Sequence, residues 1–179
     1  AGASLPYLQE MAEGFRAGAD YAAATLGYPE ASCSLHFIPP SLNGLVDPTE
    51  ATKWANLYWD KGVDVIFTLS GASNFAVIET AKEAPGRRVV ASDSDQESLG
   101  KNVVLGSVVR RNDLTLTRLI GAMWAGGLGG GHEVVSEASG EVQWAPNPAF
   151  AEAWVEFDED KALAEAADEA TSLYLGEAP

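Results

Sequence analysis

The sequence predicts an α/β fold built on a parallel, Rossmann-like sheet, and the stretch from Gly62 to Gln96 carries that prediction. Residues Val63–Leu69 form a short apolar run rich in β-branched side chains, which is typical of a strand buried on both faces. A turn and a helical pattern follow, and Arg88–Ser92 has the composition of a second strand. Together they form a βαβ unit, which is the repeating unit of parallel sheets.

Polar residues follow both of these strands. Ser70–Asn74 comes after the first strand, and Asp93–Gln96 comes after the second. Because parallel strands connected in a right-handed sense end at the same edge of the sheet, the two segments are expected to lie close together. Open α/β sheets bind their ligands outside this edge, so we expect a binding site there.

The chain before the central unit has signals for two helices and a strand. Ser4 is a suitable N-cap for a helix that ends at Gly27, with apolar residues at three-to-four spacing between them. Cys33–Ile38 is predicted to be a strand, and the irregular loop Pro39–Gly44 follows its carboxyl end. A second helix is expected to begin at Asp47-Pro48.

The chain after the central unit has weaker signals. In chain order, its pattern predicts a strand (Val103–Val109), a helix (Leu114–Trp124), a glycine-rich connector (Gly126–Gly131), two short strands (Glu133–Ser136 and Glu141–Trp144) that turn at Ser139-Gly140, and a final helix (about Asp158–Leu175). The connector is not a phosphate-binding loop, because no Lys-Ser/Thr pair follows it.

Composition limits the classes of function. The net charge of −15 repels nucleic acid and anionic membranes, and only Arg110 and Arg111 approach a basic patch, so we expect no nucleic-acid partner. No apolar run reaches the roughly twenty residues that a membrane helix needs. The single cysteine, Cys33, excludes an internal disulfide and a cysteine-rich zinc site.

Few residues are candidates for chemistry. Asp93 and Asp95 could accept hydrogen bonds from a sugar diol or an amine, or they could simply form a turn and a helix cap, and both interpretations stay open. Cys33 and His36 cannot form a thiol–base pair if they lie three apart in a strand, because such residues point to opposite faces. His132 has no second ligand at metal-binding spacing, so we expect no metal and no cofactor.

Several segments resemble the basic membrane protein family. GFRAGADYA, Asp47-Pro48, GVDVIFTLSGASN, AVIETAKE, SDSDQ and SVVRRND occur in that family's order and spacing over roughly Met11 to Asp113. The resemblance implies a substrate-binding lipoprotein of an ABC transporter, with members that bind purine nucleosides. It also implies the type I periplasmic-binding-protein fold, in which two three-layer α/β lobes flank a cleft.

The resemblance covers only the second half of a family member. We therefore expect residues 1–113 to form a ligand-binding lobe, and residues 114–179 to be a segment that in the family returns to the other, here incomplete, lobe. The first half would be missing or supplied by a second chain. The family implies a permease partner, membrane contact only through a lipid anchor outside this chain, and a place at the periplasmic or extracellular face of a bacterial membrane.

Family roles transfer to individual positions. Asp93 matches the family's cleft aspartate, expected to hold ribose hydroxyls, and Arg110 replaces a lysine. Arginine keeps the charge but has a planar, bulkier head, so the family's hydrogen-bond geometry cannot be assumed. Leu45 stands where some members have a base-stacking aromatic residue, whose place Phe75 or a tryptophan could take. The expected ligand-binding set is Asp93, Gly71, Arg110, Asn74, Phe75, Asn43 and Leu45.

The leading functional hypothesis is a non-catalytic solute-binding protein for a nucleoside-like or other small polar ligand. The alternative is a regulatory or assembly domain that keeps the fold but has lost the ligand. A hydrolase with Asp93 or Asp95 as base ranks third, because the sequence supplies no combination of nucleophile, base and orienting group.

Overall fold

The computed structural model describes residues 1–26, 32–39, 42–130 and 135–150. The helices and strands within them are α1 (Pro6–Leu26), α2 (Pro48–Asp60), β1 (Val65–Phe67), α3 (Asn74–Lys82), β2 (Arg88–Asp93), β3 (Val104–Arg110), α4 (Asn112–Trp124) and β4 (Val142–Pro146). The described residues also include the short 3₁₀ helices η2 (Gly71–Ser73), η3 (Glu97–Leu99) and, after β4, η4 (Pro148–Phe150).

The described residues form a sheet of order β1-β2-β3-β4. β1 and β2 are parallel, with Val65 opposite Arg88, and β2 and β3 are also parallel. Helix α3 connects β1 to β2, so the predicted βαβ unit and the parallel α/β sheet are confirmed. β4 is antiparallel to β3.

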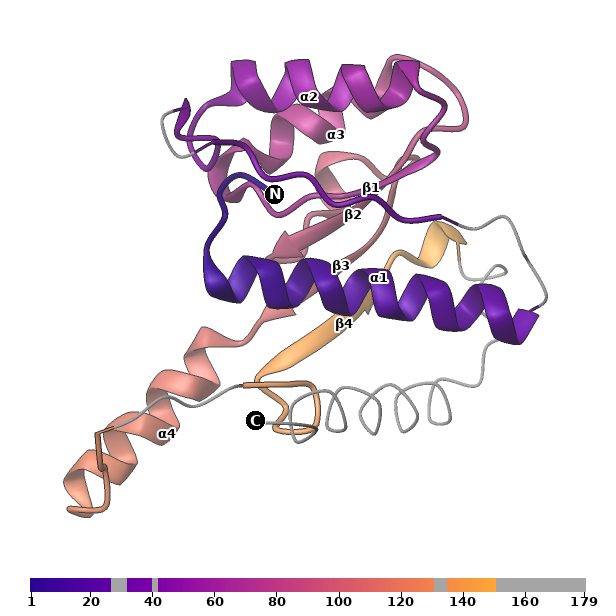
Figure 1. Ribbon diagram of the computed structural model, residues 1–179. Helices are drawn as coiled ribbons and strands as arrows, with labels where there is room; N and C mark the ends of the chain where they lie inside the picture. Colours follow the sequence, from indigo (N-terminus) through magenta and orange to yellow (C-terminus); the bar gives the residue numbers. More distant parts are fainter. Residues whose placement is uncertain (27–31, 40–41, 131–134, 151–179) are drawn as a thin grey trace, which may run out of the picture.

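Helices cover both faces of this sheet, which gives three layers (Figure 1). On one face, α2 and α3 bury their apolar side chains against β2 and β3, with Ile78 and Val89 fully buried. On the other face, Leu8 and Ala12 of α1 pack near Phe67 and Leu69. Each fully buried aliphatic side chain contributes about 1.5–3 kcal/mol through burial, so the α2–α3 face holds most of the core.

Helix α2 begins where the sequence predicts. The Asp47 side chain accepts hydrogen bonds from the backbone N–H groups of Thr49 (3.0 Å) and Glu50 (3.1 Å), and Pro48 fills the first helical position. The Nε1 of Trp59 donates to Oγ1 of Thr80 at 3.0 Å and ties α2 to α3. Helix α1 instead begins at Pro6, two residues after the predicted cap.

One strand prediction is wrong, and one predicted strand has a different partner. Residues 33–38 run alongside β1 without forming a strand, and the backbone hydrogen bonds that they make among the described residues are those of His36 and Ile38 to Ala1. A strand needs a paired neighbour, and the described residues supply one at that end alone. The segment at Glu141–Trp144 does form a strand, but it pairs with β3 rather than with a preceding strand.

Other predicted features fall outside the described residues. They are His132, part of the Glu133–Ser136 strand, and the final helix at Asp158–Leu175. The division into residues 1–113 and 114–179 stays a prediction. Among the helices that the structure describes, none combines the length and the apolar character needed to cross a membrane.

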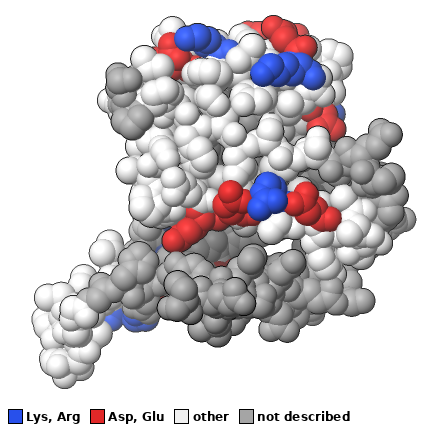
Figure 2. Space-filling model, viewed as in Figure 1, with Lys and Arg blue, Asp and Glu red and all other residues white. Residues whose placement is uncertain are grey.

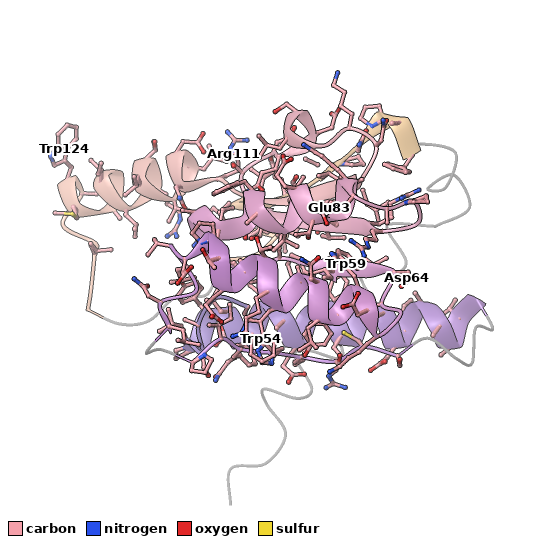
Figure 3. The ribbon with its side chains drawn as sticks, turned by 90° about the horizontal axis from the view of Figure 1, so that it is seen from above. Trp54, Trp59, Asp64, Glu83, Arg111 and Trp124 are labelled. Atoms are coloured by element: carbon pink, nitrogen blue, oxygen red, sulfur yellow. The ribbon has the colours of Figure 1, made fainter. Side chains whose placement is uncertain are left out.

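Helix α4 extends away from the three layers (Figure 1). None of its residues is buried. Trp124 is 90% exposed, and Figure 3 shows it at the far end of α4, pointing away from the sheet. Charged side chains lie instead in a row over α1 (Figure 2), where Arg16 pairs with Glu13 and Asp20.

Candidate ligand-binding site

The polar residues that the sequence places after the strands do meet at one edge of the sheet. Thr68 and Ser70 follow β1, Asp93 ends β2, and Arg110 ends β3. Parallel β1, β2 and β3 bring these ends together, as expected for an open α/β sheet. The edge therefore gathers side chains from three strands.

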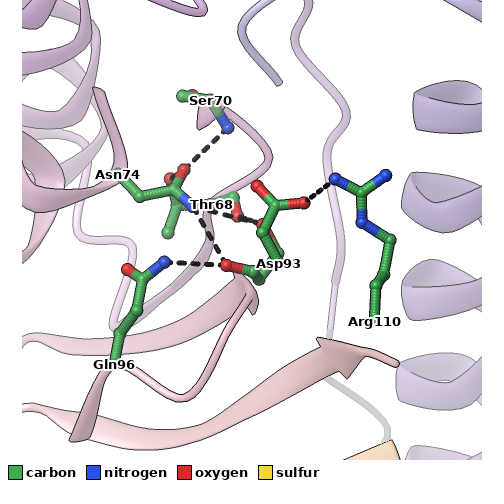
Figure 4. Close-up of polar contacts among 7 residues, drawn as sticks. Thr68, Ser70, Asn74, Asp93, Gln96 and Arg110 are labelled. Carbon is green, nitrogen blue, oxygen red and sulfur yellow. Dashed lines mark hydrogen bonds and ion pairs between the residues drawn. The ribbon is translucent and has the colours of Figure 1, made fainter. Parts of the chain in front are cut away.

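Asn74 links the ends of β1 and β2 (Figure 4). Its Oδ1 accepts hydrogen bonds from Oγ1 of Thr68 (2.8 Å) and from the backbone N–H of Ser70 (2.7 Å). Its Nδ2 donates to the backbone oxygen (3.3 Å) and to Oγ (3.2 Å) of Ser92. Because Asn74 is only 1% exposed, these bonds form in a low-dielectric environment and hold the loop after β1 in place.

Gln96 extends this network toward β3. Its Nε2 donates to the backbone oxygen of Ser92 at 2.7 Å, and its backbone N–H donates to Oγ of Ser107 at 3.0 Å. Oε1 of Gln96 is buried and has no hydrogen-bond partner among the described residues. Buried polar atoms are nearly always satisfied in folded proteins, so this oxygen is a free acceptor at the edge.

Asp93 and Arg110 form an ion pair at the tips of β2 and β3. Nη2 of Arg110 donates to Oδ1 of Asp93 at 2.5 Å, and both side chains are about one-third exposed. The guanidinium carbon lies 6.0 Å from the ring centre of Tyr7 in α1, which is within cation–π range. At this exposure the ion pair contributes about 0–1 kcal/mol to stability. Its place at the tips of β2 and β3 is therefore more relevant to a binding site than its effect on stability.

The backbone of Asp93 is strained. Its φ is +79°, in the left-handed region that a residue with a Cβ rarely adopts. Such conformations cost about 1–3 kcal/mol and occur most often at functional sites. The strain turns the chain sharply after β2 and marks Asp93 as the residue to test.

Three of the predicted residues, Gly71, Asn43 and Leu45, lie in two loops, which contact each other at Gly71 and Leu45. Gly71 has a φ of +54°, and a Cβ there would lie 3.2 Å from the backbone oxygen of Leu45. The backbone N–H of Val46 donates to the Asn43 oxygen at 3.0 Å, which closes a turn. Leu45 therefore packs directly on Gly71, and a larger residue at position 71 would force the two loops apart.

The Phe75 side chain lies in a different part of the molecule, beside α2. It is 48% exposed and lines a hollow of about 360 Å³ between α2 and α3, together with Pro48, Thr49 and Thr52. The structure thus brings Asp93 to Arg110 and Gly71 to Leu45, but places Phe75 against α2.

The remaining chemical candidates have structural roles. Oδ1 of Asp95 accepts from the backbone N–H of Glu97 at 3.0 Å, which is the turn interpretation of this residue. Burial raises the pKa of the Cys33 thiol, which disfavours the nucleophilic thiolate. Within the described ranges, no group of three or more His, Cys, Asp or Glu side chains is arranged to hold a metal.

Four residues at this edge were not expected from the sequence: Tyr7, Thr68, Ser92 and Ser107. The three small hydroxyl residues lie in strands or at their ends, where a buried polar side chain in an apolar run is the available signal. Tyr7 lies in the first turn of α1, and nothing in its local sequence relates it to β3.

A three-layer parallel lobe with polar groups gathered at the carboxyl ends of its strands defines an α/β ligand-binding domain. A family model described as ABC transporter substrate-binding protein, PnrA-like, matches residues 1–142. The chain belongs to this family, whose members are non-catalytic binding proteins.

Two curated relatives support the assignment. The chain is 43% identical to basic membrane protein D of Borreliella burgdorferi over 60 residues, which are 33% of this chain and 17% of that protein. It is 31% identical to basic membrane protein B of Borreliella afzelii over 98 residues, which are 54% of this chain and 26% of that protein. The matches thus span about a quarter or less of the relatives' length.

Solved structures confirm the fold. A solute-binding protein of an ABC transporter system from Aeropyrum pernix K1 matches 96% of this chain with a TM-score of 0.64 and 20% identity. A transcriptional activator of the comK gene from Bacillus halodurans matches 90% with a TM-score of 0.60 and 18% identity. The chain covers 49% and 52% of these structures, so it corresponds to about half of each.

Proposed function

We propose that this chain is the carboxyl-terminal half of a non-catalytic solute-binding protein of an ABC-type importer, and that it recognises a nucleoside-like or other small polar ligand at the edge formed by β1, β2 and β3. The observation that carries the proposal is Asp93, a strained carboxylate at the tip of β2 in a family of substrate-binding proteins.

In this proposal Asp93 accepts hydrogen bonds from a ligand diol such as that of a ribose. Arg110 occupies Oδ1 of Asp93, so we assign Oδ2 to the ligand. Hydrogen bonds to a charged acceptor contribute about 1.5–3 kcal/mol each. Asn74 positions the loop after β1, and Gly71 with Leu45 and Asn43 forms the loop wall.

The test is calorimetric titration of a full-length form of the protein with purine nucleosides, pyrimidine nucleosides and simple sugars. Asp93→Asn is expected to weaken binding of the recognised ligand about 10- to 100-fold. The matched control is Asp113→Asn, because Asp113 is an exposed carboxylate that pairs with Arg111 instead. No binding by any of these ligands, or equal affinity in Asp93→Asn and the unmodified protein, would overturn the proposal.

The other parts of the assembly follow from the same proposal. The ligand would be passed to an ABC permease at the periplasmic or extracellular face of the membrane. Contact with the membrane would be made through a lipid anchor outside this chain. Residues 1–113 would form one wall of the cleft. The opposite wall would come from the first half of the protein or from a second chain, and residues 114–179 would return toward that opposite wall.

The alternative is a regulatory or assembly domain of the same fold that has lost its ligand. It is favoured by one observation: Asp93 is already paired with Arg110, which also lies over Tyr7. Arg110→Lys distinguishes the two. Lysine is a compact point charge without the planar fork, so it frees Asp93 more readily and is expected to strengthen ligand binding if the site is functional. An assembly domain would bind no ligand in either form.

A further inference from the structure

Arg110 contacts two elements that are far apart in the sequence. It is the last residue of β3, and its guanidinium pairs with Asp93 at the tip of β2 and lies near Tyr7 in the first turn of α1 (Figure 4 shows the pair with Asp93). In the register of the sheet, Asp93 stands opposite Val109, so Arg110 lies one residue beyond the carboxylate that it pairs with. The three side chains therefore form a row of contacts along the candidate edge, from α1 to β2.

The Arg110 side chain has one polar group that this arrangement leaves unsatisfied. Nη2 donates to Oδ1 of Asp93 at 2.5 Å, and the guanidinium carbon lies 6.0 Å from the centre of the Tyr7 ring. Nε, in contrast, is buried and has no hydrogen-bond partner among the described residues. A buried N–H without a partner is costly, whereas the same group is hydrated when the side chain turns outward. Asp93 and Tyr7 thus offset a cost that favours the release of Arg110.

Both contacts of the guanidinium are weak, because both are exposed to water. The side chains of Arg110 and Asp93 are about one-third exposed, and Tyr7 is 45% exposed. Exposed ion pairs and exposed cation–π contacts each contribute little, since water competes for the charged groups. The paired and released positions of Arg110 are therefore close in free energy, and a small change at Tyr7 is enough to alter their populations.

The position of Arg110 determines what Asp93 offers to a ligand. While Arg110 is paired, Oδ1 of Asp93 is occupied and Oδ2 remains as an acceptor. A diol has two hydroxyl donors, so a carboxylate with both oxygens open can accept one hydrogen bond on each. Release of Arg110 therefore favours binding of a diol, and a contact that retains Arg110 on Asp93 opposes it.

Tyr7 lies outside the apolar core that attaches α1 to the sheet. That core is formed by Leu8 and Ala12 of α1 with Leu69, and all three are buried. Tyr7 is adjacent to Leu8 in the sequence but is exposed. A substitution at Tyr7 is therefore expected to leave the packing of α1 intact, which makes its contact with Arg110 testable.

We propose that Tyr7 is a positioning residue that retains Arg110 on Asp93 and thereby lowers the affinity of the site for a ligand with a diol. Tyr7 does so with the face of its aromatic ring, not with its hydroxyl group. The effect on affinity rests on the proposed function, whereas the retention of Arg110 does not, so the two are measured separately.

The first measurement uses the full-length form of the protein without ligand. The exchange rate of the Arg110 Nε–H with solvent is measured by NMR, and its signal is assigned by its loss in Arg110→Lys. In Tyr7→Leu the rate is expected to rise about two- to fivefold, because this buried N–H reaches water only when Arg110 is released. Tyr7→Phe keeps the ring face and is expected to keep the rate of the unmodified protein. An unchanged rate in Tyr7→Leu, or equal increases in the two variants, would overturn the proposal.

The second measurement repeats the calorimetric titrations with nucleosides and sugars on the same variants. Tyr7→Leu is expected to bind the recognised ligand about two- to fivefold more tightly, and Tyr7→Phe is expected to bind it as the unmodified protein does. The control is Tyr58→Leu, which removes a tyrosine whose ring faces a different cation, Lys61 at 5.2 Å, and which is expected to change neither readout. Unchanged or weaker binding in Tyr7→Leu would overturn the effect of Tyr7 on affinity.

The two measurements separate the role of Tyr7 from the proposed function. If the Arg110 exchange rate rises in Tyr7→Leu but no nucleoside or sugar binds to any form, the proposed function and the effect on affinity fail, while the retention of Arg110 by Tyr7 is supported. If a ligand binds but the exchange rate is the same in Tyr7→Leu and the unmodified protein, the proposed function stands and the role of Tyr7 fails.

Discussion

Helices α3 and α4 have similar apolar sequences but bury very different amounts of surface. Six of the nine residues of α3 are buried between α2 and the sheet, and Ile78 is 0% exposed. None of the thirteen residues of α4 is buried, and Ile120 is 50% exposed. The local pattern therefore predicts a helix in both cases, whereas burial depends on whether the chain supplies a neighbour.

The two helices are also held differently. α3 is fixed along its length by core packing and by Asn74 in its first turn. α4 is held at its middle, where Nε of Arg118 pairs with Glu141 at 3.1 Å. An amphipathic helix without a packing partner gains little beyond its own backbone bonds, and such helices are marginal in isolation.

The largest expected effect is in the core of α3. Ile78→Ala removes fully buried methyl groups and leaves a cavity, so the free energy of unfolding is expected to fall by about 2–5 kcal/mol. Ile120→Ala makes the same chemical change in α4, where it is expected to cost less than about 0.5 kcal/mol. Urea unfolding of both variants measures the difference. Equal losses would mean that α4 is packed against something in solution.

A smaller effect is expected at the start of α3. Asn74→Ala removes the side chain that links β1 to β2 and leaves the N–H of Ser70 unpaired, so we expect a loss of about 2–3 kcal/mol. Ser73→Ala is the matched control. Ser73 is adjacent and equally buried, but its Oγ has no hydrogen-bond partner among the described residues, so the change is expected to be neutral or stabilising. Similar losses in the two variants would show that burial, not the network, stabilises this turn.

The sequence was sufficient to predict the central unit and the gathering of polar residues at one edge of the sheet. The β-branched run before Ser70 and the cap at Asp47 are local signals, and both gave the observed elements. The position of Asp93 at the same edge as Ser70 followed from the parallel connection between the two predicted strands. The strand prediction at residues 33–38 was wrong because strand formation requires a neighbour, and within the described part of the chain the backbone partner of these residues is Ala1.

Contacts between distant parts of the chain could not be predicted. Nothing in the sequence relates Arg110 to Tyr7, because that contact depends on how α1 packs on the sheet. Nothing relates Glu141 to α4 either, because that contact depends on how β4 pairs with β3. Phe75 was expected to replace a stacking aromatic residue, and that role stays a prediction. Successive helical residues point in different directions, and the Phe75 side chain lies against α2.

The smallest expected effect concerns the attachment of α4. Burial alone would raise the pKa of Glu141, but hydrogen bonds from Thr115, Arg118 and Ser139 outweigh it and lower that pKa below its usual value. The unfolded chain therefore binds the proton more tightly, so the stabilisation from Glu141 is fully present above about pH 4.3 and is lost as the pH falls through the lowered pKa. The protection of α4 amides, which is how much more slowly they exchange than an unstructured amide at the same pH, is expected to fall over that range in the unmodified chain. In Glu141→Gln the protection should be low at all these pH values, whereas Glu137→Gln, in the adjacent turn, should keep the pH dependence. A pH dependence that survives Glu141→Gln would assign the attachment of α4 to another carboxylate.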